Sequence, residues 1–162
     1  MNILKLILSL SLLFTLQANA QQAASTADIV QNALQQKEEM QKNSIVKNVP
    51  FTNIGPTIMS GRVTDLAVNP DNPSEFYVAY ASGGVWYTVN NGTTFTPILD
   101  NSNTQNVGDI AVDWKSRTIW VGTGENNSSR SSYAGIGILK SSDNGKTWQN
   151  VGLTDSDRKS VV

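Results

Sequence analysis

The stretch Ser141-Ser142-Asp143-Asn144-Gly145-Lys146-Thr147-Trp148 has the pattern S-x-D-x-G-x-T-W and stands between two apolar, strand-like runs. A looser copy, Thr88-Val89-Asn90-Asn91-Gly92-Thr93-Thr94-Phe95, precedes it in the chain. Glycine accepts a positive φ, and an Asp or Asn side chain accepts hydrogen bonds from backbone N–H groups just ahead of it. Each stretch is therefore expected to form a tight turn between two antiparallel strands, with the final aromatic ring anchoring the next strand.

A structural role fits Asp143 better than a catalytic one. The other copy has Asn90 at this position, which preserves hydrogen bonding but not acid–base chemistry. The residues expected to build the two turns are Thr88, Asn90, Gly92, Thr94, Phe95, Ser141, Asp143, Gly145, Thr147 and Trp148.

Both turns belong to a longer internal repeat. Residues 63–68, 76–79 and 84–88 recur, with similar chemistry, as residues 107–112, 119–122 and 137–141. The second copy carries an insertion at 125–134. Four short strands in roughly 45 residues are typical of one β-propeller blade. The expected strands are 63–70, 75–81, 84–90 and 93–100 in the first blade, and 107–114, 117–123, 135–142 and 146–151 in the second.

The predicted fold is therefore all-β, made of four-stranded antiparallel propeller blades. About two blades are expected, over 63–100 and 107–153, with a third beginning near residue 159. Propellers close with roughly four to eight blades, so residues 50–162 are expected to be the amino-terminal part of a longer propeller. The alternative is a two-blade protein that assembles into rings.

Residues 1–20 have the pattern of a signal peptide. Lys5 precedes an apolar run at 6–16, and Ala18-Asn19-Ala20 predicts cleavage after Ala20. Gln17 ends the run before it is long enough to span a membrane. The sequence therefore predicts a secreted, periplasmic or cell-envelope protein without a membrane span after cleavage.

Residues 21–49 are polar and are expected to form a spacer with a possible helix over about 26–43. Ser25-Thr26-Ala27-Asp28 resembles a capping box with Asp in place of Glu. A ragged apolar stripe leaves three alternatives open: a solvated spacer, a helix packed on the outside of the domain, or a helix that binds a partner.

Composition narrows the possible chemistry. The net charge is −1, which gives no electrostatic footprint for nucleic acid. The chain has no Cys and no His, so thiolate chemistry, a Ser-His-Asp triad and the commonest transition-metal ligands are excluded in this stretch. No metal and no cofactor are expected, and any catalysis would rest on carboxylates, Tyr, Lys or Arg.

Several motifs together resemble a known family. They are Ile54-Gly55-Pro56, Ser60-Gly61-Arg62-Val63-Thr64-Asp65, Ser82-Gly83-Gly84-Val85-Trp86 and Val121-Gly122-Thr123-Gly124-Glu125, with the turn at 141–148. The chain is similar over about 50–162 to the sortilin-type and xyloglucanase-like propellers with Asp-box (bacterial neuraminidase, BNR) repeats. The similarity is greatest to exported bacterial proteins labelled "glycosyl hydrolase" or "sortilin N-terminal domain".

The resemblance implies a fold more clearly than an activity. Xyloglucanase-type members cleave β-glucans with two Asp residues, one of them in a T-D-x-G-G-like turn. The corresponding turn here, residues 80–84, keeps the double glycine but has Ala81 at the Asp position, which puts hydrolysis there in doubt. The Arg motif of sialidases is missing as well.

In a propeller of this kind, ligands are expected on the face formed by Ser82-Gly83, residues 101–106 and the inserted loop 125–134. Glu125 is the best-placed carboxylate there, as a ligand-binding residue, a weak catalytic candidate or a structural acceptor for its loop. The other ligand-binding candidates, with a solvated loop as the alternative, are Arg62, Arg130 and Tyr133. Asp65 and Asp109 occupy equivalent repeat positions, which favours a shared structural bond.

The function that these features favour is a binding platform for a protein, peptide or glycan on the propeller loop face. The alternative is a glycoside hydrolase of the xyloglucanase-like type whose catalytic carboxylates lie largely outside this stretch. An assembly scaffold on the cell surface is a third interpretation. Whether the chain is an enzyme stays open at the level of sequence.

Overall fold

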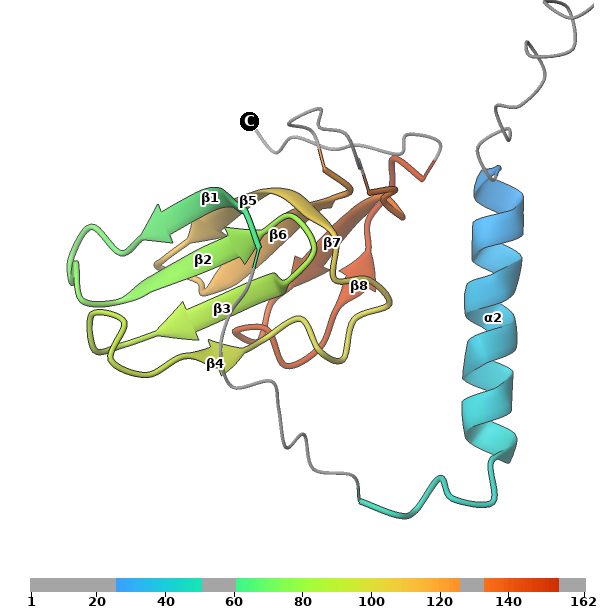
Figure 1. Ribbon diagram of the computed structural model, residues 1–162. Helices are drawn as coiled ribbons and strands as arrows, with labels where there is room; N and C mark the ends of the chain where they lie inside the picture. The colour runs from blue at the N-terminus through green and yellow to red at the C-terminus, as the bar shows by residue number, and fades with distance from the viewer. Residues whose placement is uncertain (1–25, 51–60, 126–132, 155–162) are drawn as a thin grey trace, which may run out of the picture.

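The structure is a computed structural model that describes residues 26–50, 61–125 and 133–154. Over these residues it contains two four-stranded antiparallel sheets, lying against each other, and one helix (Figure 1). The first sheet consists of β1 (Val63–Val68), β2 (Phe76–Tyr80), β3 (Gly84–Thr88) and β4 (Thr96–Pro97). The second consists of β5 (Val107–Asp113), β6 (Thr118–Thr123), β7 (Ile138–Ser141) and β8 (Gln149–Asn150). The predicted signal peptide, Arg130 and the expected start of a third blade lie outside the described residues.

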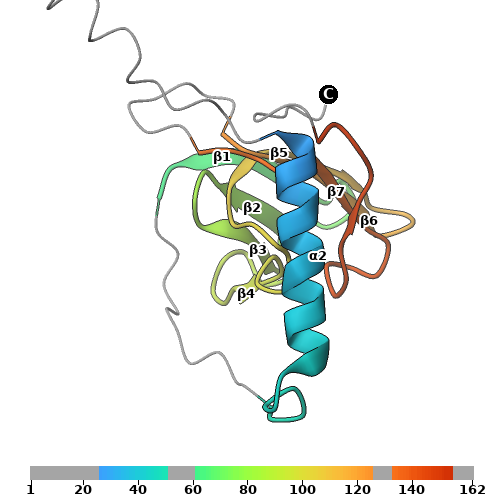
Figure 2. The same ribbon diagram turned by 90° about the vertical axis from the view of Figure 1, so that its right-hand side faces the viewer.

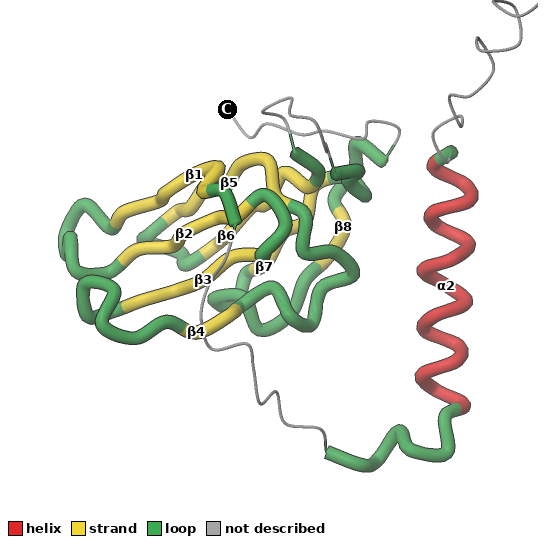
Figure 3. Tube along the Cα trace, in the orientation of Figure 1, coloured by secondary structure: helices red, strands yellow, loops and turns green. Residues whose placement is uncertain are grey.

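Each sheet is a simple meander. The strand orders are β1-β2-β3-β4 and β5-β6-β7-β8, so every strand pairs with its neighbour in sequence. This is the topology of a propeller blade. Figure 3 shows the two meanders one behind the other.

The outermost strand of each sheet is shorter than its sequence predicts. β4 and β8 have two residues each, whereas strands were expected over 93–100 and 146–151. The turn before each strand takes up the missing residues, because residues 90–94 and 143–147 make hydrogen bonds to one another instead of to a neighbouring strand. Pro97 also lacks an N–H for the ladder.

The inner strands carry the same irregularity. The register with the neighbouring strand shifts between Val63 and Asp65 in β1, and between Val107 and Asp109 in β5. A β-bulge re-aims the side chain that follows it. The bulges thus place two equivalent carboxylates, Asp65 and Asp109, at the same level of adjacent inner strands.

The core lies between the two sheets. Tyr77, Ala79 and Val85 on one face of the first sheet are buried together with apolar side chains on one face of the second. The second-sheet residues of this core cluster are Val107, Ile110, Ile119, Val121 and Leu139. Strand residues alternate between the two faces of a sheet, so each sheet has a second face that points away from this core.

Helix α2 (Ala27–Asn43) stands beside the sheets at the end where β2 turns into β3 (Figures 1 and 2). None of its residues is buried. Lys37 Nζ donates to Asn103 Oδ1 at 2.7 Å. The N-cap of α2 is Thr26, whose side chain makes no cap hydrogen bond. The predicted capping box, which requires Ser25 as the N-cap, is therefore not the arrangement found. No helix in the described part of the chain is both long and apolar enough to cross a bilayer.

Candidate functional site

The turn between β7 and β8 is held by side-chain hydrogen bonds. Ser141 Oγ donates to Asp143 Oδ1 at 2.7 Å and accepts from the buried backbone N–H of Gly145 at 2.9 Å. Asp143 accepts from the Thr147 N–H at 2.9 Å and from its hydroxyl at 2.7 Å. The Thr147 donors, with Ser141, lower the pKa of Asp143 to about 2. Among the described residues, the hydrogen bonds of the Asp143 side chain are therefore all made within its own turn.

The turn between β3 and β4 repeats this arrangement with an amide. Thr88 Oγ1 accepts from the Gly92 N–H at 3.0 Å, and Asn90 Oδ1 accepts from the Thr94 N–H at 2.9 Å. Asn90 Nδ2 then donates to the Thr94 hydroxyl at 2.9 Å, where the carboxylate of the other copy accepts instead. Both residue types complete the same turn.

The aromatic residue that follows each turn packs differently in the two copies. Phe95 meets Phe76 edge to face within the first sheet, with ring centroids 6.0 Å apart. Trp148 reaches across to the first sheet, where its indole Nε1 donates to the Ile98 carbonyl at 2.9 Å. A Cβ on Gly145, whose φ is +86°, would stand 2.8 Å from Ile98 Cβ. The second turn therefore also fastens one sheet to the other.

An ion pair lies at the opposite end of the inner strands. Arg62 immediately precedes β1 and Glu125 follows β6 by two residues. Their side chains meet, with Arg62 Nη2 against Glu125 Oε1. The Glu125 side chain is 0% exposed, whereas that of Arg62 is 45% exposed. Apart from this ion pair, neither carboxylate oxygen of Glu125 accepts a hydrogen bond from a residue that the structure describes.

This asymmetry has a clear electrostatic consequence. A carboxylate removed from water must be compensated by a partner, because an unpaired buried charge is strongly destabilising. Arg62 supplies that compensation for Glu125 with part of its guanidinium. A guanidinium has five N–H donors in a rigid fork, so the solvent-exposed part of Arg62 retains donors for a further acceptor.

Backbone contacts gather the remaining loop residues around this pair. The Glu125 N–H donates to the Tyr133 carbonyl at 3.0 Å. The Tyr133 side chain is exposed. Asn106 accepts from the Gly124 N–H at 3.0 Å through its carbonyl, and its side chain donates to the Ala134 carbonyl at 3.1 Å. Arg62, Glu125 and Tyr133 thus come together at one end of the sheets, and Arg130 lies outside the described residues.

The position that carries an Asp in the xyloglucanase-like turn is structural in this chain. Ala81 is buried, and its N–H donates to the Arg62 carbonyl at 2.9 Å. Its carbonyl accepts from the Val107 N–H at 3.2 Å. Ala81 therefore links the segment before β1 to the start of β5, and no carboxylate stands there.

Asp65 and Asp109 contact each other across the two inner strands. Burial, followed by the hydrogen bond to Asp109, raises the pKa of Asp65. Asp65 also accepts from the N–H groups of Leu66 at 2.7 Å and of Ile110 at 3.0 Å. Two carboxyl groups in contact favour sharing a proton, because both cannot ionise without repulsion. The structure shows the contact between these equivalent positions.

A second charged cluster, which the sequence analysis did not identify, joins the sheets at the end of β1 and β5. Arg117 pairs with the buried Glu75, which also accepts from Tyr87 Oη and from Asn69 Nδ2 at 2.7 Å. Arg117, then Tyr87 and Asn69, lower the pKa of Glu75 to about 2 against the cost of its burial. Arg117 has φ +59°, a conformation unusual for a non-glycine residue.

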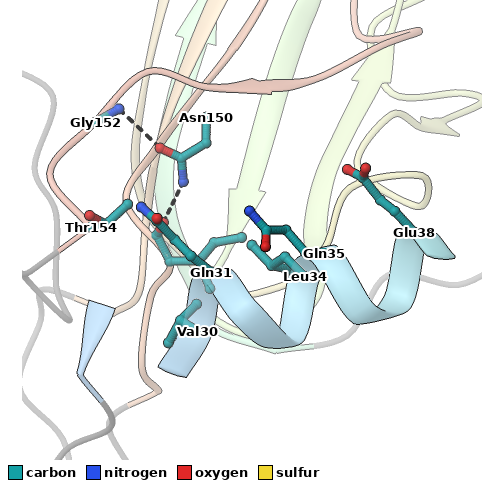
Figure 4. A pocket seen from close by; sticks show the side chains of 9 residues that line it. Val30, Gln31, Leu34, Gln35, Glu38, Asn150, Gly152 and Thr154 are labelled. Carbon is teal, nitrogen blue, oxygen red and sulfur yellow. Dashed lines mark hydrogen bonds between the residues drawn. The ribbon is translucent and has the colours of Figure 1, made fainter. Parts of the chain in front are cut away.

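A groove of about 370 Å³ separates α2 from the second sheet. Figure 4 shows Val30 and Leu34 of the helix on one side and Asn150 and Gly152 on the other. The Asn150 side chain donates to the Ile136 carbonyl and accepts from the Gly152 N–H.

Within the described ranges, no three His, Cys, Asp or Glu residues converge on a point where they could hold a metal ion.

Comparison with known proteins gives structural neighbours only. No protein-family model matches the chain, and no curated protein matches it. The crystal structure of an ancestral GH74 enzyme superposes with a TM-score of 0.49 and 22% identity over 65% of this chain and 16% of the enzyme. The GH74 enzyme of Niastella koreensis superposes with a TM-score of 0.39 and 23% identity over 61% of this chain and 13% of the enzyme. The chain thus spans a small part of these enzymes, and the likeness carries no argument about activity.

Proposed function

We propose that this chain is an exported protein built from β-propeller blades, and that it binds a glycan or peptide ligand where Arg62 and Glu125 meet. The observation that carries this proposal is the pairing of a fully buried carboxylate with a half-exposed guanidinium. The blade assignment is supported by the two meanders with equivalent bulges and turns. Export is supported by the predicted signal peptide.

The chemistry of the pair favours recognition of a polar ligand. Glu125 fixes the orientation of Arg62, so less side-chain entropy is lost when a ligand accepts from the guanidinium. Carboxylate, carbonyl and hydroxyl oxygens all accept hydrogen bonds from such donors. Tyr133 lies in the inserted loop 125–134, next to this pair, and its exposed ring offers a surface for stacking against a sugar or a peptide group. Glycan and peptide ligands share these features.

A glycoside hydrolase is the second candidate, and Glu125 is the observation that favours it. A glycosidase needs two carboxylates with a defined separation, one of which carries a proton. Arg62 engages the Glu125 carboxylate, and Ala81 occupies the position where a second carboxylate would be expected. Binding without cleavage is therefore the function that we propose.

Incubation with β-glucan oligosaccharides separates the two candidates. The purified protein should retain an oligosaccharide or a peptide from a panel on an affinity column, and no new reducing ends should accumulate. Accumulation of reducing ends that is lost in Glu125→Gln would establish hydrolysis in place of binding. Retention of no member of the panel would contradict both candidates.

A further inference from the structure

Each of the two side-chain-bonded turns contains an Asn-Gly peptide bond. Asn91-Gly92 lies between β3 and β4, and Asn144-Gly145 lies between β7 and β8. The two Asn residues have φ values of +55° and +61°, in the left-handed region that Asn adopts more readily than most residues. Asn-Gly bonds are prone to spontaneous deamidation, because glycine has no side chain to shield its backbone nitrogen. Both turns therefore contain a bond that can react without an enzyme.

Deamidation begins at the backbone nitrogen of the glycine. After losing its proton, this nitrogen attacks Cγ of the preceding Asn side chain. A bond forms between the nitrogen and Cγ, the bond between Cγ and Nδ2 breaks, and the departing amide takes up a proton and leaves as ammonia. Water then opens the resulting succinimide ring, which gives Asp or isoaspartate. The proton on the glycine nitrogen and the position of the Asn side chain therefore control the rate.

In the second turn, the hydroxyl group of Ser141 holds this proton in place. The Gly145 N–H is buried and donates to Ser141 Oγ at 2.9 Å. The Ser141 hydroxyl proton is directed to Asp143 Oδ1 at 2.7 Å, so Oγ presents only lone pairs to the nitrogen. A deprotonated Gly145 nitrogen would face these lone pairs, with the Asp143 carboxylate behind them, instead of a hydrogen-bond donor. The arrangement therefore opposes loss of the proton.

The Asn144 side chain is held as well. The Tyr77 hydroxyl of the first sheet donates to Asn144 Oδ1 at 2.6 Å. This bond anchors the amide group to the other sheet and restricts the rotation that would bring Cγ to the Gly145 nitrogen. The nitrogen and the carbon that must react with each other are thus held by two different contacts.

The first turn protects its glycine nitrogen in the same way. The Gly92 N–H donates to Thr88 Oγ1 at 3.0 Å. The Thr88 hydroxyl in turn donates to Asn90 Oδ1 at 3.0 Å, so its lone pairs face the nitrogen as those of Ser141 do. A neutral amide here replaces the carboxylate of the second turn. Two turns of different sequence therefore place a hydroxyl oxygen on the nitrogen that would react.

We propose that the hydroxyl groups of Ser141 and Thr88 protect the Asn-Gly bonds of their own turns from deamidation. The protection is local, because each hydroxyl accepts from one glycine N–H. Asn144 and Asn91 are then latent modification sites, which react when the hydroxyl is lost or the turn unfolds. Isoaspartate at Asn144 would add a methylene group to the backbone of the turn that fastens the second sheet to the first.

The test removes one hydroxyl at a time. Ser141→Ala and Thr88→Ala each change one turn, and the other turn of the same molecule is the internal control. Ser141→Thr keeps a hydroxyl and should retain slow deamidation. Arg117→Met, which weakens the contact between the sheets outside both turns, controls for a general loss of stability. Circular dichroism verifies that each variant is folded.

Peptide mass spectrometry after incubation at mildly alkaline pH gives the rate at each Asn. Ser141→Ala should deamidate about tenfold faster than the wild type at Asn144 and no faster at Asn91, the change expected for the loss of one ordinary hydrogen bond. Thr88→Ala should show the reverse. Wild-type protein denatured in guanidinium chloride should lose the protection at both sites, which tests the proposal even where a variant does not fold.

Three results would overturn the proposal. The first is an unchanged rate in both alanine variants. The second is equal acceleration at both Asn residues, or acceleration in Arg117→Met that matches Ser141→Ala, because either would assign the effect to unfolding. The third is the same rate in the native and the denatured wild type.

Discussion

Arg117 in the second sheet's β5–β6 turn binds the carboxylate of Glu75 at the start of the first sheet's β2 with both terminal nitrogens of its guanidinium. The second of these contacts, from Nη2 to Oε2, spans 3.3 Å. Glu75 is buried, and Arg117 also lies over the Trp114 ring, with Cζ 5.5 Å from its centroid. The two sheets are thus joined by a polar contact as well as by the apolar core.

Removing the cation of this pair should destabilise the protein. In Arg117→Met the Glu75 carboxylate keeps Tyr87 and Asn69 as donors but loses its counter-charge. We expect the free energy of unfolding to fall by about 1–3 kcal/mol, which is less than for a fully buried pair because the Arg117 side chain is 41% exposed. Urea unfolding measures this, with Lys115→Met in the same turn as a charge-matched control. The double variant Glu75→Gln/Arg117→Met should recover part of the loss, and equal loss in Lys115→Met would contradict this role.

The pair should also impose a dependence of stability on acid pH. The pKa of Glu75 is lowered from 4.5 to about 2 in the folded protein. A lowered carboxyl pKa contributes stability that is complete above the unfolded pKa and is lost as pH falls towards the folded value. The stability difference between wild type and Glu75→Gln should therefore be constant from pH 7 to about 5 and shrink between about 4.5 and 2. A difference that does not change over this interval would show that Glu75 does not titrate as described.

Asp65 should act in the opposite direction. Its pKa is raised by burial and by its contact with Asp109. A raised pKa contributes stability that is complete below the unfolded value of 3.8 and is lost as pH rises through the folded value. Asp65→Asn keeps an acceptor for the Ile110 N–H and removes one charge. We expect this variant to be more stable than the wild type at pH 7, with the gain disappearing below about pH 4, as chemical denaturation at both pH values would show.

The turn between β7 and β8 depends on one buried hydroxyl. In Ser141→Ala the buried Gly145 N–H loses its acceptor, which costs about 1–3 kcal/mol for an orphaned donor. Ser142→Ala, at the exposed neighbouring position, should leave the unfolding free energy nearly unchanged. Thermal unfolding of the two variants side by side tests this, and equal effects would contradict the structural role of Ser141.

Local patterns in the sequence account for much of the fold. Repetition of the turn at 141–148, with Asn90 in place of Asp143, indicated hairpins whose side chains bond within the turn, and the hydrogen bonds lie there. Each observed strand falls inside a predicted one. The predicted capping box at the start of α2 was wrong in its N-cap residue, because Thr26 is the N-cap and makes no side-chain hydrogen bond there.

Contacts between the sheets are what the sequence could not supply. Glu75 and Arg117 are 42 residues apart in the sequence. The repeat period predicts equivalent positions in the two sheets, but it does not predict which side chains contact each other across them. The available signal was an acidic residue, Glu75, at the start of the predicted strand 75–81 in a chain with only 15% charged residues. Arg62 and Glu125 were assigned to the same face, but only their three-dimensional placement shows that they form an ion pair.

Calorimetric titration of ligands into the wild type and the double variant Arg62→Met/Glu125→Gln tests the central claim most directly. The double variant removes both charges together, so neither is left buried and unpaired, and Lys115→Met controls for the loss of a surface charge. The account predicts that a β-glucan oligosaccharide or a peptide from the panel binds the wild type and the control, and binds the double variant at least about tenfold more weakly, a difference of about 1.4 kcal/mol. Equal affinity of a folded double variant, or no binding by the wild type, would contradict it.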